Sequence, residues 1–313
     1  MSSAGSDFVV TKEHRRFAEF CDACRRYRYV GLCYGSPGVG KTLSARAYAQ
    51  WDMVEASQPV RAVSGTALAA LVNSHTVFYT PPVVNSPTQI ARDIAQLRHG
   101  LHAIQWEQIE REERAHVDAA LKQEKVKQDQ RFLHKGWPPD RLPPGPRSLG
   151  PLYEQVTEDY YLRRKALADP TTLVVIDEAD RFKMTALEQV RALFDHGGIG
   201  LILIGMPGIE KRLARYPQLY SRVGFVHAFR PLSAVEMREL LQHKWLPFGV
   251  TLPEDGITDE EVLAAIMRIT GGNFRLLHRL ITQIARLVEI NTLPTVTAQV
   301  VDAARESLVI GMA

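Results

Sequence analysis

The apolar residues of this chain gather into short uninterrupted runs, separated by longer segments in which they recur every three or four positions. Uninterrupted runs rich in Val, Ile and Leu are typical of strands buried on both faces of a parallel sheet, and the spaced pattern is typical of amphipathic helices. The runs cover 29–34, 76–79, 172–176, 200–205 and 223–229. Because helical segments separate these runs, the sequence predicts an open α/β fold with a parallel five-stranded sheet.

From residue 232 onward the pattern is entirely helical, which predicts a second, smaller domain. Helices are expected there over 233–246, 259–270, 273–289 and 296–309. Near the amino terminus, Phe17, Phe20 and Cys21 recur at helical spacing and predict a helix over 11–28. We therefore expect an arm and helix over 1–28, an α/β core over 29–230 and a helical domain over 231–313.

The segment over 100–165 exceeds what a compact core of this kind needs. Its first part, 104–131, carries seven acidic and six basic residues mixed in sign, as in a solvent-exposed helix with ion pairs between turns. Pro and Gly enrich 136–151, which predicts a linker or ordered loop, and 153–168 is helical again. We interpret this segment as a helical insertion that is either a partner surface or a structural decoration.

The segment after the first strand matches the phosphate-binding pattern G-x-x-x-x-G-K-[ST] at every fixed position. Its residues are Gly35, Ser36, Pro37, Gly38, Val39, Gly40, Lys41 and Thr42. Glycines let backbone N–H groups curl around a phosphate, and the helix expected over 43–51 adds the positive end of its dipole. We expect Lys41 to reach the β- and γ-phosphates of ATP and the Thr42 hydroxyl to bind Mg²⁺.

The apolar run over 172–176 ends in two acids, Asp177 and Glu178. The carboxyl ends of parallel strands form the ligand edge of an α/β sheet, so these carboxylates are expected to face the phosphates. Asp177 is placed to hold Mg²⁺, directly or through water, and Glu178 to polarise the water that attacks the γ-phosphate. Both motifs together predict a nucleotide-hydrolysing site.

Composition restricts the partners only weakly. The chain has 313 residues with a net charge of +3, so a nucleic-acid partner would need a local basic patch. Its three cysteines do not make a disulfide framework, and Cys21 and Cys24 are expected to be small buried thiols rather than a metal site. The sequence contains no apolar run of membrane-spanning length and no signal-peptide pattern, which favours a cytoplasmic protein without a membrane partner.

The P-loop, the acidic strand end, the apolar run over 200–205, an Arg-bearing segment at 218–223 and the helical domain together resemble an AAA+ ATPase. In that family the position of Arg222 carries the arginine finger, which reaches the γ-phosphate held by a neighbouring subunit; Arg212 and Arg215 are alternatives. The segment 271–275 resembles the sensor-2 motif. The resemblance implies that Arg275 contacts the nucleotide of its own subunit and that the helical domain is a lid.

One position departs from the family pattern. The end of the 200–205 strand usually carries a polar residue that helps to orient the attacking water, and here Gly205 and Met206 stand there. We therefore expect slow hydrolysis, stimulated by assembly.

Within the family, the chain resembles the regulators of transposition target selection of the TnsC, MuB and TniB type, through the segments 175–182 and 203–207. This resemblance implies ATP-dependent assembly into a homo-oligomeric ring or helical filament on double-stranded DNA, followed by recruitment of a transposase or targeting protein. Binding through an inner channel would tolerate any DNA sequence and depend steeply on salt. The candidate basic residues for such a channel are Arg92, Arg98, Arg181 and Lys183, and the alternative for each is a solvated surface charge.

Two other functions remain open. A nucleotide-gated scaffold that recruits a protein and barely hydrolyses ATP would suit the apolar strand end at Gly205 and the long insertion. A helicase loader or replication initiator would share the same core, but an initiator is expected to append a winged-helix or helix-turn-helix DNA reader after the lid.

Overall fold

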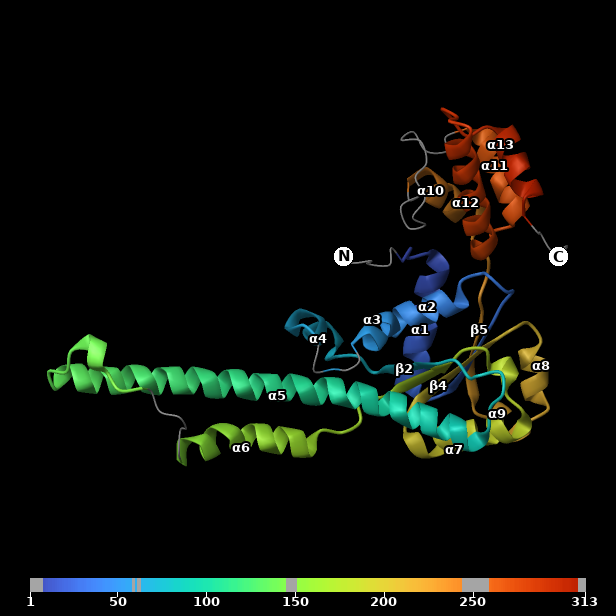
Figure 1. Cartoon of the computed structure of the whole chain (residues 1–313). Coiled ribbons are helices and arrows are strands. Elements are labelled where there is room, and N and C mark those ends of the chain that lie inside the picture. The colour runs from blue at the N-terminus through green and yellow to red at the C-terminus, as the bar shows by residue number, and fades with distance from the viewer. Residues whose placement is uncertain (1–7, 58–59, 61–62, 145–150, 244–258, 309–313) are drawn as a thin grey trace. The chain divides into compact units, whose positions relative to one another are not determined.

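The computed structural model describes residues 8–57, 60, 63–144, 151–243 and 259–308. Five strands form one sheet, which Figure 1 draws together with the helices around it. The strand order is β2-β3-β4-β1-β5, and the pairs β1–β4, β1–β5 and β3–β4 are parallel. The strands are β1 (Val30–Tyr34), β2 (Thr76–Tyr79), β3 (Leu173–Ile176), β4 (Gly200–Gly205) and β5 (Val223–Ala228). The predicted α/β fold with a parallel five-stranded sheet is confirmed.

The central strands are apolar because both of their faces are covered. Every residue of β3 and β4 is buried, whereas the residues of β5 alternate between half-buried and exposed, as expected of an edge strand. The helices that flank these strands are α2 (Lys41–Tyr48), α7 (Met184–Gly197), α8 (Ile209–Ala214) and α9 (Pro217–Tyr220). The short helix α9 begins at Pro217 itself, where a missing N–H costs nothing.

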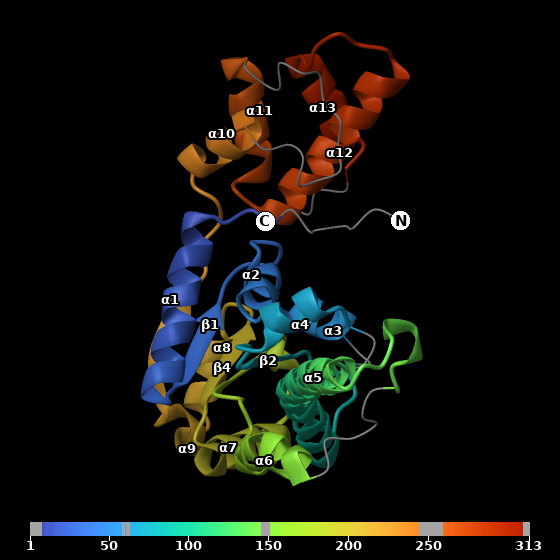
Figure 2. The same cartoon turned by 90° about the vertical axis from the view of Figure 1, so that its left-hand side faces the viewer.

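Helix α1 (Lys12–Tyr27) packs along β1, β4 and β5 (Figure 2). Thr11 caps its start by accepting a hydrogen bond from the His14 N–H at 3.0 Å. Phe17 and Cys21 are completely buried on its inner face, at the helical spacing that the sequence predicted. Cys24 is buried beside them, and burial raises its pKa to about 12, so the thiol stays protonated and acts as a packing group.

The chain divides into two compact units. The first comprises Met1–Ala49, Phe78–Arg92 and Thr172–Ala313, and the second comprises Gln50–Val77 and Asp93–Thr171. The second unit therefore includes more of the chain than the segment 100–165. Its elements are α3 (Trp51–Ala56), α4 (Gly65–Leu71), most of α5 (Pro87–His134), the short 3-10 turn η2 (Pro139–Arg141) and α6 (Pro151–Ala166).

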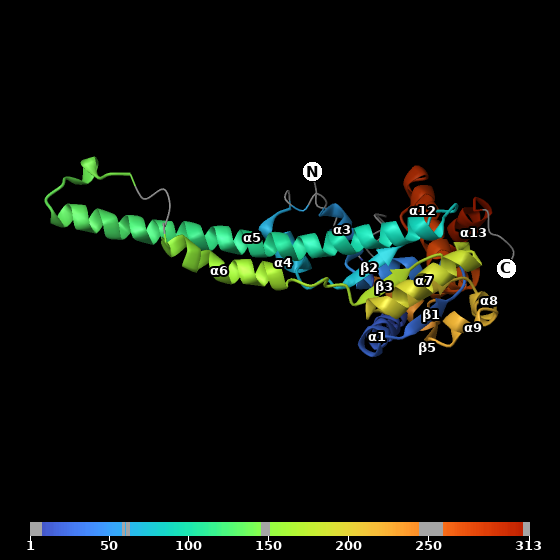
Figure 3. The same cartoon turned by 90° about the horizontal axis from the view of Figure 1, so that it is seen from below.

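Within the second unit, α6 runs alongside α5 (Figure 3). Ion pairs of 2.9 Å join Arg163 to Glu112 and Arg164 to Glu113, and the Arg164 guanidinium also lies 5.7 Å from the ring centroid of Trp106. These contacts between mixed charges hold the two polar helices together where few apolar residues are available. The segment 104–131 is helical as its charge pattern predicted, and ion pairs between turns join Arg111 to Glu107 and Arg114 to Glu110.

Two helices differ from the pattern expected. The helix expected over 104–131 is part of one helix of 48 residues that begins at Pro87 and is about 72 Å long. Gly100 costs a helix about 1 kcal/mol, but buried Ile94, Leu101 and Ile104 continue one stripe across it. The helix expected over 43–51 instead ends at Tyr48, because Gln50 adopts a left-handed conformation (φ 51°) from which α3 begins.

The carboxy-terminal helices form a bundle of their own (Figures 1 and 2). They are α10 (Ala234–His243), α11 (Glu260–Thr270), α12 (Phe274–Ile290) and α13 (Ala298–Glu306). Completely buried Leu277, Ile281 and Ile284 on α12 meet apolar side chains of the other three helices. Residues 244–246 and Val309, which the sequence placed in helices, lie outside the described residues, as do 1–7 of the expected arm and 145–150 of the expected linker.

Candidate nucleotide-binding site

The loop between β1 and α2 adopts a conformation that suits a phosphate. Gly38 and Gly40 have φ angles of 82° and 107°, which residues with a Cβ rarely adopt. Gly40 is the N-cap of α2 and has no side chain with which to bond the first N–H groups of that helix. These N–H groups and the helix dipole therefore remain directed toward the loop, as an anion site requires.

Lys41 lies within this loop. Its Nζ donates hydrogen bonds to the carbonyl oxygens of Gly35 at 2.6 Å and Ser36 at 2.9 Å, and the residue is only 9% exposed. Burial lowers the pKa of Lys41, and the negative charges of Asp177 and Asp180 oppose that shift. The ammonium group is thus held over the loop among carboxylates, where it can bind phosphate oxygens.

Thr42 and Asp177 meet although 135 positions separate them. The Thr42 Oγ1 hydroxyl donates to Asp177 Oδ2 at 2.6 Å, and Asp177 is buried. The backbone holds Asp177 in place, since its N–H donates to the Tyr79 carbonyl at 2.9 Å and its Oδ1 accepts from the Glu178 N–H at 2.8 Å. Hydroxyl and carboxylate oxygens are ligands that Mg²⁺ prefers, so this pair fits a magnesium site beside the phosphate loop.

Glu178 sits at the same strand end in an uncommon backbone conformation, with φ 49°. Its side chain is about half exposed, and its Oε2 forms an ion pair with the Nη2 of Arg181. The Arg181 Nη1 also donates to the Pro81 carbonyl at 2.5 Å. The sequence predicted the position of Glu178 at the strand end but not the ion pair that holds its carboxylate.

The helical domain reaches the phosphate loop through the segment that resembles sensor 2. The Arg275 N–H donates to the Gly38 carbonyl at 2.9 Å, and the Asn273 Nδ2 donates to the Pro37 carbonyl at 2.8 Å. A Cβ on Gly38 would lie 2.5 Å from Asn273 Oδ1, so the glycine also permits this close approach. The positive charge of Arg275 contributes to the lowered pKa of Lys41. Asn273 was missed as a contact residue, because its position at a helix start explained it as a cap.

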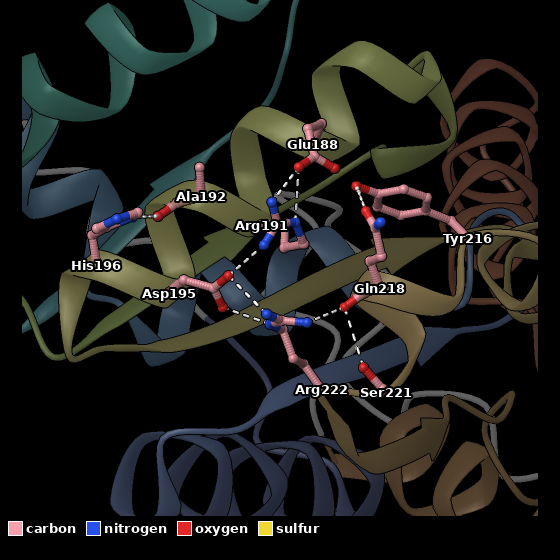
Figure 4. A network of polar contacts seen from close by, with 9 residues as sticks. All are labelled: Glu188, Arg191, Ala192, Asp195, His196, Tyr216, Gln218, Ser221 and Arg222. Carbon is pink, nitrogen blue, oxygen red and sulfur yellow. Dashed lines mark hydrogen bonds and ion pairs between the residues drawn. The ribbon is translucent and has the colours of Figure 1, made fainter.

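Arg222 is bound within its own chain (Figure 4). Its Nε and Nη2 donate to the two carboxylate oxygens of Asp195 at 2.5 Å and 2.8 Å, and its Nη1 donates to the Gln218 carbonyl. Asp195 also accepts from the Arg191 Nη1 at 2.6 Å, and Arg191 in turn pairs with Glu188. This network fixes the direction of the Arg222 guanidinium, which nevertheless keeps 29% of its side chain exposed.

The alternative arginine fingers and the candidate DNA-binding residues differ in the hydrogen bonds and ion pairs that they form. Arg212 donates to the carbonyl oxygens of Asp180, at 2.5 Å, and of Phe182. Arg98 forms an ion pair of 2.7 Å with Asp169 in the second unit, and Arg181 is bound as described above. The remaining residues, Arg92, Lys183 and Arg215, are exposed. A role of any of these residues in DNA contact stays a prediction.

Comparison with known proteins gives the class. The family model described as AAA domain matches residues 24–213, more than half of the chain, so this chain belongs to the AAA-domain family. The expected AAA+ class is confirmed. A potential ATP-binding protein of Staphylococcus aureus is 38% identical over 309 residues, which make up 98% of each chain.

Two further similarities are more limited. A Mu-like prophage DNA transposition protein B of Haemophilus influenzae is 30% identical over 114 residues, which cover 34% of this chain and 36% of that protein. The structure of the Aeropyrum pernix Orc1 protein in complex with DNA superposes with a TM-score of 0.53 at 18% identity, over 96% of this chain and 66% of that chain. The second similarity shows a shared fold, and the more particular transposition type stays a prediction. None of the described helices combines the length and apolarity needed to cross a membrane.

Proposed function

We propose that this protein is an ATPase that assembles on double-stranded DNA in a nucleotide-dependent way and marks that DNA for a transposase or targeting protein. The observation that carries the ATPase part is the 2.6 Å contact between Thr42, which follows Lys41 in the phosphate loop, and Asp177. It joins two oxygen atoms of the kind that Mg²⁺ prefers. The partial similarity to a DNA transposition protein and the fold shared with a DNA-bound Orc1 protein support the DNA part.

The proposed reaction uses residues of the α/β core. Lys41 and the N–H groups of the 35–42 loop bind the phosphates, and Thr42 with Asp177 would hold Mg²⁺, which neutralises charge on the phosphate oxygens when bound. A water oxygen forms a bond to the γ-phosphorus while the bond between that phosphorus and the bridging oxygen breaks, releasing ADP. Glu178 accepts the proton of that water, which requires its carboxylate to leave Arg181.

In the proposed architecture, residues 29–230 supply the catalytic core and residues 231–313 the lid. Arg275 and Asn273 connect the lid to the loop that would hold ATP, so nucleotide binding would change the position of the lid. Arg222 would serve the active site of a neighbouring subunit. Asp195 of the same chain forms an ion pair with Arg222 and so gives the guanidinium a defined direction before assembly.

The test is nucleotide-dependent assembly. Purified protein with a non-hydrolysable ATP analogue, Mg²⁺ and duplex DNA should form rings or filaments that electron microscopy resolves. Lys41→Ala should remain unassembled, because loss of the ammonium removes a phosphate contact. Persistent monomers of the unaltered protein under these conditions would exclude assembly on DNA as its function.

A scaffold with little hydrolysis is the second candidate. The ion pair between Glu178 and Arg181 favours it, because a carboxylate held by an arginine is a poor base toward water. The helical pair α5–α6 would then be the surface that recruits a protein partner. ATP turnover separates the two candidates, since the scaffold would bind ATP and assemble without releasing phosphate.

A further inference from the structure

The carboxyl end of β4 carries no polar side chain of its own, yet a carboxylate lies beside it. β4 ends at Gly205, followed by Met206. The Met206 N–H donates a hydrogen bond of 2.7 Å to Oδ2 of Asp180, which comes three positions after Asp177 in the 3-10 turn η3 (Ala179–Arg181). A residue from the neighbouring strand end therefore brings a polar group to the position where the sequence shows none.

Gly205 and Asp180 fit each other sterically. A Cβ added at Gly205 would lie 2.6 Å from Asp180 Oδ2 and 3.1 Å from its Cγ, closer than such atoms approach without displacement. The carboxylate of Asp180 thus occupies, together with Cδ1 of Ile209 at 2.5 Å, the space into which a side chain at 205 would project. The absence of a side chain at this strand end is what allows the carboxylate to lie there.

This position faces the candidate nucleotide site from the centre of the sheet. β4 lies between β3, which ends before Asp177, and β1, which leads into the phosphate loop. Gly205 is in register with Tyr34, the residue before Gly35. The negative charge of Asp180 also acts on Lys41 and raises its pKa against the effect of burial. The carboxylate therefore lies within electrostatic range of the ammonium group that would bind the phosphates.

The turn that carries Asp180 is fixed from its other side. Arg212 on α8 donates to the carbonyl oxygens of Asp180 and Phe182, and Phe182 is completely buried. Among the contacts of the described residues, Oδ2 of Asp180 is the carboxylate oxygen that has a partner, which leaves Oδ1 available to a water molecule. Asp180 is thus a rigidly held carboxylate with one engaged and one available oxygen.

We propose that Asp180 is a positioning residue for ATP hydrolysis, which replaces in space the polar side chain that Gly205 and Met206 lack. Through the Met206 N–H it fixes the end of β4, and through its second oxygen it orients the water that attacks the γ-phosphate. The proposal rests on the proposed ATPase function. It would also explain how the proposed ATPase hydrolyses ATP although β4 ends without a polar side chain.

Two substitutions separate the charge of Asp180 from its hydrogen bond. Asp180→Asn keeps the size of the side chain and an oxygen that accepts from the Met206 N–H, but it removes the charge. Asp180→Ala removes both. Asp302→Asn, at an exposed position on α13, is the control for a change of one charge elsewhere on the protein.

Three quantities are measured for each variant: the affinity for a fluorescent ATP analogue, the rate of phosphate release and the hydrogen exchange of the Met206 amide. Asp180→Asn should bind the analogue and protect the Met206 amide as the unaltered protein does, while its phosphate release falls about tenfold or more. Asp180→Ala should lose the protection as well as the turnover. Asp302→Asn should match the unaltered protein in all three.

The outcomes distinguish the proposed role of Asp180 from the proposed ATPase function. If Asp180→Asn releases phosphate at the rate of the unaltered protein, Asp180 merely caps the strand end and the proposal about its charge is wrong. If Asp180→Ala keeps the Met206 amide protected, the hydrogen bond on which the proposal depends is absent in solution. If the unaltered protein binds ATP but releases no phosphate, the proposed ATPase function fails, and the positioning role fails with it.

Discussion

At the scale of single residues, the carboxylates at the end of β3 have different surroundings, and these surroundings suit the different roles proposed for them. Asp177 is buried and bound to Thr42, which suits a group that holds a metal ion. Glu178 is half exposed, has a strained backbone and pairs with Arg181. A carboxylate that can leave an arginine and bind a water molecule suits a general base, because it can move to the attacking water when the nucleotide binds.

Glu178→Gln tests this division. The amide cannot accept the proton of the attacking water, so turnover should fall by about 100-fold or more, while nucleotide binding and assembly remain. Phosphate release and binding of a fluorescent ATP analogue are measured side by side. Glu124→Gln on α5 is a matched control, because Glu124 pairs with Lys127 at the same spacing of three residues. Equal turnover of Glu178→Gln and the unaltered protein would remove Glu178 from the reaction.

At the scale of elements, the segment between α9 and β5 presents Arg222 with its direction already set. Asp195 on α7 binds the guanidinium through both oxygens, and Gln218 on α9 accepts from its third nitrogen (Figure 4). Contacts from two helices restrict the rotamers of a long side chain, so less entropy is lost when the guanidinium meets a phosphate. An arginine arranged in this way suits action across a subunit interface.

Arg222→Ala should therefore leave nucleotide affinity unchanged and reduce turnover of the assembled protein by about 10³-fold. Mixing it with Glu178→Gln should restore phosphate release, since the Glu178→Gln subunits still offer Arg222 to the intact sites of the others. Arg215→Ala, at an exposed position nearby, should behave as the unaltered protein. The finger role would be refuted if Arg222→Ala lost turnover equally under conditions where the protein stays monomeric.

At the scale of the whole molecule, the proposed function requires more than one copy of this chain and a polyanion. The net charge of +3 is small, so in the proposed function DNA would be attracted by local groups, for which Arg92 and Lys183 are candidates, rather than by the protein as a whole. Assembly would repeat these few groups along the duplex. Repetition converts a weak contact of one subunit into strong binding by many.

Binding to DNA should consequently depend steeply on salt. With the non-hydrolysable analogue present, affinity for a duplex of any sequence should fall by about tenfold or more between 50 and 200 mM salt. Fluorescence anisotropy of labelled duplexes measures this fall. Arg92→Ala and Lys183→Ala should each reduce the slope, whereas Lys211→Ala, outside the predicted set, should leave it unchanged. An affinity that does not vary with salt would argue against backbone recognition.

The sequence alone determined those features that depend on interactions between residues close together in the chain. Apolar runs predicted the strands, and capping residues such as Thr11, Asp259 and Asn273 mark helix starts close to those expected. The phosphate loop is likewise a local pattern, because its glycines adopt their φ angles within eight residues. Helix boundaries that depend on surroundings were missed, such as the break at Gln50 and the continuation of α5 through Gly100.

The tertiary structure alone decided which distant residues meet. Thr42 and Asp177 are brought together across 135 positions, and Asn273 reaches Pro37 across 236. Asp180 reaches the end of β4 only because β3 and β4 are neighbours in the sheet, an order that no local pattern specifies. Backbone propensities act over a few residues, whereas these contacts arise from the packing of whole strands and helices. Residue types therefore showed what chemistry is available, and packing determined where it acts.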